Sequence, residues 1–159
     1  MDNLLSYPLI ILVSLLFYYK TWNYYYVSDD LPVAAKVEPN PIGRIHALWI
    51  QFTGQRYFNY NKDWNLRNWC TPKTAHIITW ALHTLNCCLI HTAFGVNKVS
   101  LLAGLYFAIN PAHTQGGAIW ISGKPYSTAT TLALAMYALP WAAPAFYYGT
   151  TLFSANAML

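Results

Sequence analysis

Two adjacent aspartates, Asp29 and Asp30, are the first residues of this chain that suggest chemistry. The 159-residue sequence has only five acidic residues, and these two follow its first long apolar stretch. A carboxylate pair at the point where a helix leaves a membrane costs charge repulsion and desolvation. Such a pair therefore either has a functional role or is fully solvated.

A polar stretch at residues 110–124 is the second candidate. It contains His113, Ser122 and Lys124 together with further hydroxyl, amide and glycine residues. Broken helices at membrane depth are tolerated where they line a cavity or are buried in protein. Groups of these types could hold a phosphate or a sugar. The alternative is a polar loop that joins two helices, and the glycine spacing excludes a nucleotide-binding P-loop.

A third set of polar residues consists of His76, His83 and Asn86, at positions i, i+7 and i+10. Seven residues make about two helical turns, so the spacing places these side chains on one helix face. Polar residues in a membrane helix usually face a protein interior or a wet cavity. Structural hydrogen bonding is the favoured interpretation and a ligand-facing role the alternative. We expect no metal site, because His76 and His83 lie too far apart for one ion.

The composition indicates which elements position these residues. The chain is 56% apolar and 9% charged, whereas soluble domains carry about 25% charged residues. An integral membrane protein is therefore expected. Residues 4–27 form the first predicted span, which ends in an aromatic belt. A cleaved signal peptide is disfavoured because no basic segment precedes the apolar run. Cys87 and Cys88 are expected to be packing residues.

The chain is predicted to be a single all-α membrane domain, residues 1–159, with about four or five helices. A large loop at 28–73 separates the first span from a helical bundle at 74–159, and residues 43–53 are expected to form an interfacial helix. The bundle's predicted helices end at Gly95, at Asn110-Pro111 and near Pro140, where the apolar pattern is interrupted. They cover residues 74–94, 99–109, 126–139 and 141 to the end.

The charge distribution points to lipid as a partner and away from nucleic acid. The net charge is +4, but the basic residues are scattered and mostly lie in the first loop. Phospholipid headgroups or a lipid phosphate are therefore the expected partners. The positive-inside rule places this loop in the cytoplasm. The basic loop residues are Lys36, Arg44, Arg56, Lys62, Arg67 and Lys73.

Taken together, these motifs resemble a known family over roughly residues 8–139. The sequence is similar to the N-terminal part of polyprenyl-phosphate-dependent glycosyltransferases of the GT-C fold. The likeness is greatest to the transmembrane and tetratricopeptide-repeat O-mannosyltransferases and their bacterial relatives. It is carried by the acidic pair, by His76-x-x-Thr79-x-x-x-His83-x-x-Asn86, by Asn110-Pro111-x-His113-Thr114-Gln115 and by Trp120-Ile121-Ser122-Gly123-Lys124.

The resemblance implies transfer of a sugar from a polyprenyl-phosphate carrier to a protein or glycan on the non-cytoplasmic side of the membrane. It assigns the general base to Asp29 or Asp30, because the acceptor hydroxyl must lose a proton as it attacks. The departing lipid phosphate needs cationic and hydrogen-bond donors. The residues expected to supply them are His113, Lys124, Arg44, Arg56 and Ser122. The lipid-linked sugar is the substrate, and no cofactor is expected.

The chain departs from the family pattern at Thr79, Gln115 and Tyr126, where relatives often have an asparagine or an acid. Full enzymes of this kind have several hundred residues, so a fragment or split subunit in a plasma or inner membrane is expected. The alternative is a non-catalytic subunit of a larger membrane complex, with close contacts through small residues such as Gly104 and Ala108. A channel or transporter fragment ranks third.

Overall fold

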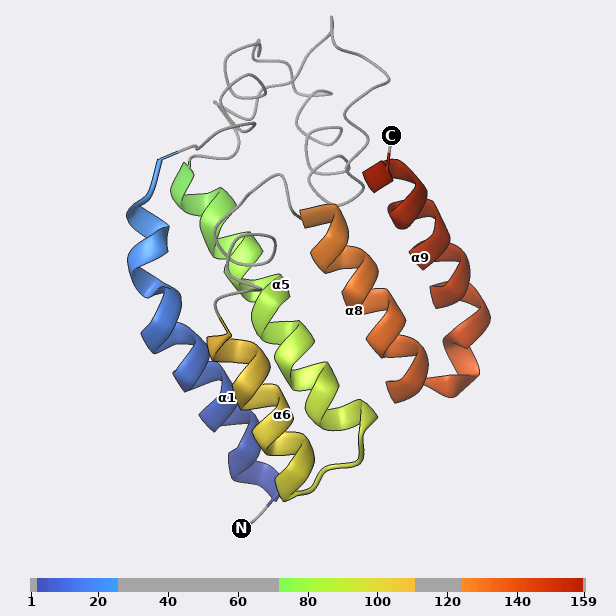
Figure 1. The fold of residues 1–159 in the computed structure, drawn as a ribbon, viewed down its shortest axis with the longest axis horizontal. Coiled ribbons are helices and arrows are strands. Elements are labelled where there is room, and N and C mark those ends of the chain that lie inside the picture. The colour runs from blue at the N-terminus through green and yellow to red at the C-terminus, as the bar shows by residue number, and fades with distance from the viewer. Residues whose placement is uncertain (1–2, 26–71, 111–123, 159) are drawn as a thin grey trace, which may run out of the picture.

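The computed structural model describes residues 3–25, 72–110 and 124–158, and these ranges are helical with short connections (Figure 1). The all-α prediction is confirmed for this part of the chain. The elements are α1 (Asn3–Tyr18), the 3₁₀ helix η1 (Tyr19–Asn23), α5 (Pro72–Ala93), α6 (Lys98–Ile109), α8 (Lys124–Ala138), the 3₁₀ helix η4 (Pro140–Ala142) and α9 (Ala143–Met158).

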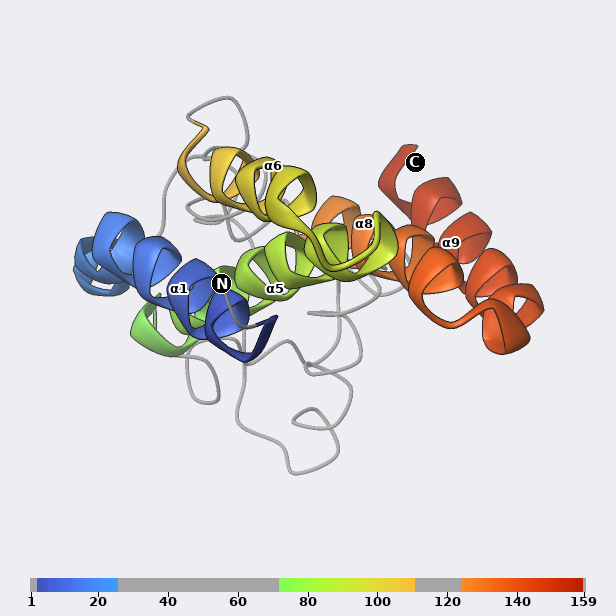
Figure 2. The same ribbon diagram turned by 90° about the horizontal axis from the view of Figure 1, so that it is seen from below.

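The helices run alternately up and down, with α5 at the centre (Figure 1). Helix α5 packs against α1, η1, α6 and α8, whereas α9 packs mainly on α8. Seen along the bundle, α6 lies over α5 and the α8–α9 pair extends to one side (Figure 2). We call the end that carries Tyr25 and Pro72 the loop end. The opposite end, which carries the α5–α6 and α8–α9 connections, is the turn end.

The first helix is shorter than the predicted span of residues 4–27. The α-helix ends at Tyr18, a 3₁₀ turn follows, and Tyr24 is extended. The Thr21 hydroxyl donates a hydrogen bond to the Tyr18 carbonyl at 2.7 Å. Such a bond offers the backbone an alternative to the regular helical pattern. The helical stretch therefore ends at Asn23, and the predicted helix of residues 4–27 was wrong at residues 24–25.

The connection between α5 and α6 agrees with the sequence. Gly95 has a φ of 73°, the left-handed conformation that glycine adopts freely after a helix. Asn97 then caps α6, because its side chain accepts from the Ser100 N–H at 2.9 Å while the Ser100 hydroxyl accepts from the Asn97 N–H at 3.0 Å. The two residues form a reciprocal capping box. This turn holds α6 antiparallel to α5.

The last two helices differ from the prediction in detail. Helix α8 begins at Lys124, two residues earlier than expected, so the backbone of Lys124 belongs to a helix and not to the preceding polar stretch. Leu139 leaves the helical conformation and Pro140 starts η4. Pro144 lies in the first turn of α9, where the backbone N–H that proline lacks would have no partner within the helix.

Helix α6 approaches α5 and α1 closely through small residues. Gly104 and Ala108 are buried, and a Cβ atom on Gly104 would lie 2.9 Å from the Cys87 carbonyl oxygen. Cys87 belongs to the buried apolar cluster and Cys88 packs against it, which confirms both cysteines as packing residues. Gly104 and Ala108 therefore serve contacts within the chain, and the expectation that they bind a partner was wrong.

One helical stretch in the described ranges, Leu5–Asn23, is long and apolar enough to cross a membrane. Lys98–Ile109 is apolar but shorter. A signal sequence or the core helix of a soluble protein can have the same length and composition. The length of this stretch alone therefore does not place it in a bilayer.

Candidate functional site

The described part of the chain buries polar side chains and exposes large apolar ones. The exposed side chains include leucines and aromatic residues on α1, α6, α8 and α9. The largest fully buried side chains include three histidines, a threonine and two serines. Among the described residues, the buried polar ones are Ser6, Ser14, Thr21, His76, Thr79, His83, Thr84, Asn86, His91, Ser100, Ser127 and Thr128.

Several of these residues meet in the contact between α1 and α5, which we call the polar seam. Ser14 and Thr84 form a hydroxyl–hydroxyl hydrogen bond of 2.7 Å at the middle of the seam. Toward the turn end, the Tyr7 and Thr92 hydroxyls lie 3.0 Å apart. Because the helices are antiparallel, residue numbers rise along α1 as they fall along α5. The seam therefore has one definite register.

His91 joins three helices at the turn end of the seam. Its Nε2 atom lies 2.8 Å from the Ser6 hydroxyl on α1, and its Nδ1 atom lies 2.9 Å from the Ser100 hydroxyl on α6. The edge of the Tyr7 ring packs against the imidazole, with ring centroids 5.1 Å apart. Both ring nitrogens are thus satisfied without a charged partner, as burial requires. Ser100 also belongs to the cap of α6, so His91 ties that cap to α1.

His83 lies near the middle of α5, between two aromatic rings. Its ring stacks on Phe107 at 5.4 Å and meets Tyr18 edge-on at 5.2 Å. The Nε2 atom lies 3.3 Å from the Ala108 carbonyl oxygen, to which its N–H can donate. Carbonyls in the last turn of a helix lack a partner within that helix. His83 therefore supports the carboxyl end of α6 at a point opposite the middle of α5.

Asn86 connects α5 to α8 rather than to α1. Its Nδ2 group donates to the Ser127 carbonyl at 3.1 Å, and its Oδ1 atom accepts from the Thr131 hydroxyl at 2.7 Å. The Thr131 hydroxyl proton is shared with the Ser127 carbonyl, which lies 2.8 Å away. Asn86 thus points to a different neighbour from His83, although both are buried.

Replacing Asn86 with alanine is expected to loosen the α8–α9 pair. A hydrogen bond within a folded protein contributes about 0.5–1.5 kcal/mol net to its stability. Loss of both bonds should therefore cost about 1–2 kcal/mol of unfolding free energy. Chemical denaturation followed by circular dichroism would measure this loss. Faster amide exchange should appear in α8 and α9 but not in α1.

Thr130→Ala is the matched control for this prediction. The Thr130 hydroxyl donates to the Tyr126 carbonyl of its own helix and is on the exposed side. Its removal should change the unfolding free energy by less than about 0.5 kcal/mol. Equal effects of Asn86→Ala and Thr130→Ala would show that Asn86 does not anchor α8.

His76 lies at the loop end, close to the last described residues before the first loop. Its Nε2 atom is 3.4 Å from the Tyr25 carbonyl oxygen, and the Tyr24 ring meets it edge-on at 6.3 Å. One turn further along α5, Trp80 packs edge-on against Trp22 of η1, with ring centroids 5.3 Å apart. These aromatic contacts hold η1 against the start of α5.

The residues predicted to perform the chemistry lie almost entirely outside the described ranges. This applies to the acidic pair and to the candidate phosphate ligands other than Lys124, for which the structure describes the helical backbone only. The residues outside are Asp29, Asp30, Arg44, Arg56, His113 and Ser122. The chain segments that carry them are joined to described residues at Tyr25, Pro72, Asn110 and Lys124.

The described residues supply hydrogen bonds and no acid–base pair. Their ranges include no aspartate or glutamate. Among these residues, no three histidine, cysteine or acidic side chains lie close enough to hold a metal ion. The imidazoles contact carbonyl and hydroxyl groups on neighbouring elements. This part of the chain is therefore suited to holding helices together.

Sequence reasoning missed His91 and its partners Ser6 and Ser100. His91 lies eight residues after His83, a spacing that returns close to the same helix face. Ser6 and Ser14 show the same eight-residue spacing in the first helix. Recurrent small polar residues within an apolar helix are the signal that could have revealed the polar seam.

Comparisons with known proteins leave the family of this chain open. No protein-family model matches the sequence. No curated protein and no solved structure matches it either.

Proposed function

We propose that this chain is a membrane-embedded helical module of a glycosyltransferase that uses a lipid-phosphate sugar donor. The single observation that carries the membrane part is the inverted distribution of polarity described above. In lipid, polar side chains gather between helices, and large apolar side chains face outward. A soluble protein of this fold would leave these outward leucine and aromatic side chains in water, at a cost for each.

The exposure of the first helix supports this proposal. Only 28% of the apolar window in Leu5–Asn23 is buried, so this stretch does not resemble the core helix of a soluble protein. Its outward face carries Leu12, Leu16 and Phe17. Helix α5 has 22 residues and is about 33 Å long, which matches the hydrocarbon thickness of about 30 Å. Its polar groups face the seam and α8.

The position of two helix ends supports a polar ligand for this module. His83 meets the carboxyl end of α6, and Asn86 meets Ser127 in the first turns of α8. Both helix ends thus lie beside the central part of α5. Helix ends at membrane depth are tolerated where they are buried in protein or line a cavity. The amino end of a helix also favours an anion such as a phosphate.

The chemical roles in this proposal follow from the resemblance. Asp29 or Asp30 removes the proton from the acceptor hydroxyl, and His113 and Lys124 stabilise the departing lipid phosphate. Arg44, Arg56 and Ser122 are the alternative donors to that phosphate. A protein or glycan acceptor would approach from the loop end of the bundle.

Cysteine labelling tests the membrane topology. Cys70→Ser and Cys88→Ala remove two of the three thiols, whereas Cys87 is buried and can stay. Single cysteines at Tyr25, Lys98 and Trp141 are then treated with a membrane-impermeant maleimide in intact and permeabilised cells. We expect Lys98→Cys and Trp141→Cys to react from one side of the membrane and Tyr25→Cys from the other.

The side from which each cysteine reacts distinguishes the membrane-embedded fold from the transferase role. Labelling of all three positions from the same side would contradict a membrane-spanning α5. The transferase role requires Tyr25→Cys to react in intact cells, because the family acts on the non-cytoplasmic side. Reaction of Tyr25→Cys only after permeabilisation would agree with the six basic loop residues and would overturn the transferase role. The membrane-embedded fold would then stand, with a subunit of a larger complex as its function.

A further inference from the structure

We infer that the turn end of the bundle carries a second aromatic girdle, which binds the phospholipid headgroup region. This inference rests on the proposed membrane location, and it assigns the membrane surface at the turn end of the bundle. The girdle residues come from the position directly after α5, from the end of α8, from η4 and from the first half of α9. The girdle comprises Phe94, Tyr137, Trp141, Tyr147 and Tyr148.

These side chains are among the most exposed of the described residues. Trp141 is 83% exposed and Tyr137 is 72% exposed. Tyrosine and tryptophan combine a large apolar ring with a polar group, and this combination suits the boundary between hydrocarbon and water. Four of the five girdle residues are of these two types. An outward face in the hydrocarbon core would instead be aliphatic, as α1 is at Leu12 and Leu16.

Contacts between helices place the girdle residues toward the turn end of the bundle. Asn86 meets Ser127, and α5 and α8 both run toward the turn end, so Tyr137 is level with the connection that follows α5. Gly149 of α9 faces Leu132 of α8. Tyr147 and Tyr148 therefore lie nearer to the turn end than Leu132 does. The five side chains therefore lie on the α5, α8 and α9 side of the turn end.

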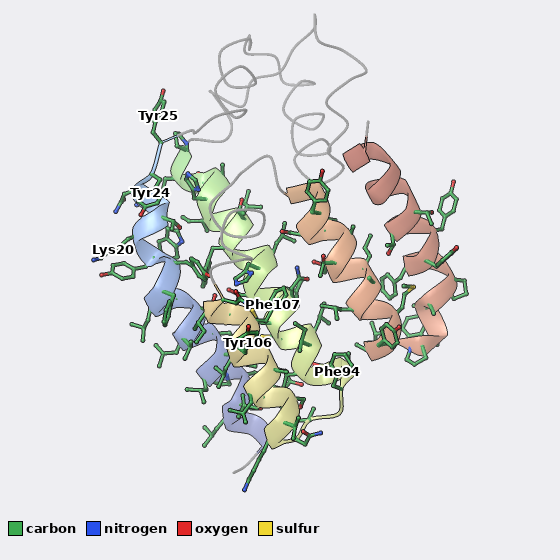
Figure 3. The ribbon with its side chains drawn as sticks, in the orientation of Figure 1. Lys20, Tyr24, Tyr25, Phe94, Tyr106 and Phe107 are labelled. Carbon is green, nitrogen blue, oxygen red and sulfur yellow. The ribbon has the colours of Figure 1, made fainter. Side chains whose placement is uncertain are left out.

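Figure 3 shows the separation between the two ends of the bundle. Tyr24, Tyr25 and Lys20 lie at the loop end, and Phe94 lies at the turn end. Each end also carries an exposed lysine, Lys20 at the loop end and Lys98 at the turn end. A lysine at the same end of the bundle as the aromatic side chains complements the negative phosphate of a phospholipid. The charge at the turn end therefore favours a headgroup over a partner helix.

Spin labels in vesicles test this inference. The protein with Cys70→Ser and Cys88→Ala is reconstituted into phosphatidylcholine vesicles that contain phosphatidylglycerol. Nitroxides are attached at Trp141→Cys, Tyr148→Cys and Leu16→Cys, and their collision rates with oxygen and with a water-soluble nickel complex are measured. We expect the first two labels to report the headgroup region. The Leu16 label should report the hydrocarbon core, with several-fold less access to nickel.

Other results have distinct meanings. The inferred girdle would be overturned if the labels at Trp141 and Tyr148 were as accessible to nickel as a label in water. It would also be overturned if these labels lay as deep in the hydrocarbon as the label at Leu16. Immobilised labels that neither reagent reaches would indicate a covering protein and would also overturn it. A Leu16 label outside the hydrocarbon would instead contradict the membrane proposal itself. All three substituted side chains are exposed, so their replacement should not disturb the fold.

Discussion

Replacing Gly104 with leucine is expected to force α6 away from α5 and to unfold the bundle in milder denaturing conditions. Even a single methyl group at this position would meet the Cys87 carbonyl oxygen at 2.9 Å and the Ile10 side chain at 3.3 Å. The nearer obstacle is backbone and cannot rotate aside. Overpacking typically costs about 1–3 kcal/mol, and a leucine here should exceed that range because the helix axes must separate.

Gly104→Ala and Gly149→Ala form a matched pair that isolates this effect. Both changes gain helix propensity of about 1 kcal/mol. At Gly149 the new methyl group meets the end of the Leu132 side chain at 3.1 Å, which can move. We expect Gly149→Ala to be neutral or stabilising and Gly104→Ala to be destabilising by about 1–2 kcal/mol. Unfolding in detergent measures both, and a stabilised Gly104→Ala protein would contradict the close approach of α6 to α5.

The double change Asp29→Asn and Asp30→Asn is expected to lower sugar transfer by about 10²–10⁴-fold, which is the usual contribution of a general base. An amide keeps the shape of the side chain but cannot accept the proton of the acceptor hydroxyl. The measurement is transfer of radiolabelled sugar from a polyprenyl-phosphate donor by membranes that contain the chain together with any partner that co-purifies with it.

Asp63→Asn is the control for the acidic pair. It removes a negative charge from the same predicted loop, and the proposal gives Asp63 no chemical role. Its transfer rate should stay within about threefold of the unchanged protein, a difference of less than about 1 kcal/mol. Undiminished transfer in the double variant would remove the acidic pair from the mechanism. Equal losses in the double variant and in Asp63→Asn would indicate a general effect of loop charge.

The helix positions in the described ranges could largely be predicted from the sequence. Long apolar runs and the breakers at Gly95, Asn110 and Pro140 marked elements within a few residues of α5, α6 and α8. These signals are local, and the backbone responds to them locally. The end of α1 was mispredicted because the Thr21 hydroxyl binds a neighbouring carbonyl, which apolar periodicity does not reveal.

The polar contacts were harder to predict, because they depend on which helices become neighbours. The spacing of His76, His83 and Asn86 placed them on one face of α5. That face is wide enough to meet different helices, so His83 contacts α6 and Asn86 contacts α8. The role of His91 depends on hydroxyls contributed by α1 and α6. Periodicity within a single helix can indicate a polar face, but it does not show which other helices supply the hydrogen-bond partners.

The polar seam has a consequence for how the helices find their alignment. Two apolar helices in lipid can slide past each other at little cost, since the side chains that separate exchange one apolar contact for another. A shift of α1 by one turn would place Ile10 where Ser6 now meets His91, and Ser6 would lie beyond its partner. The bond between the His91 Nε2 atom and the Ser6 hydroxyl would then be lost, and in the proposed membrane location no water would replace it. The polar seam therefore favours one register between α1 and α5 over the others.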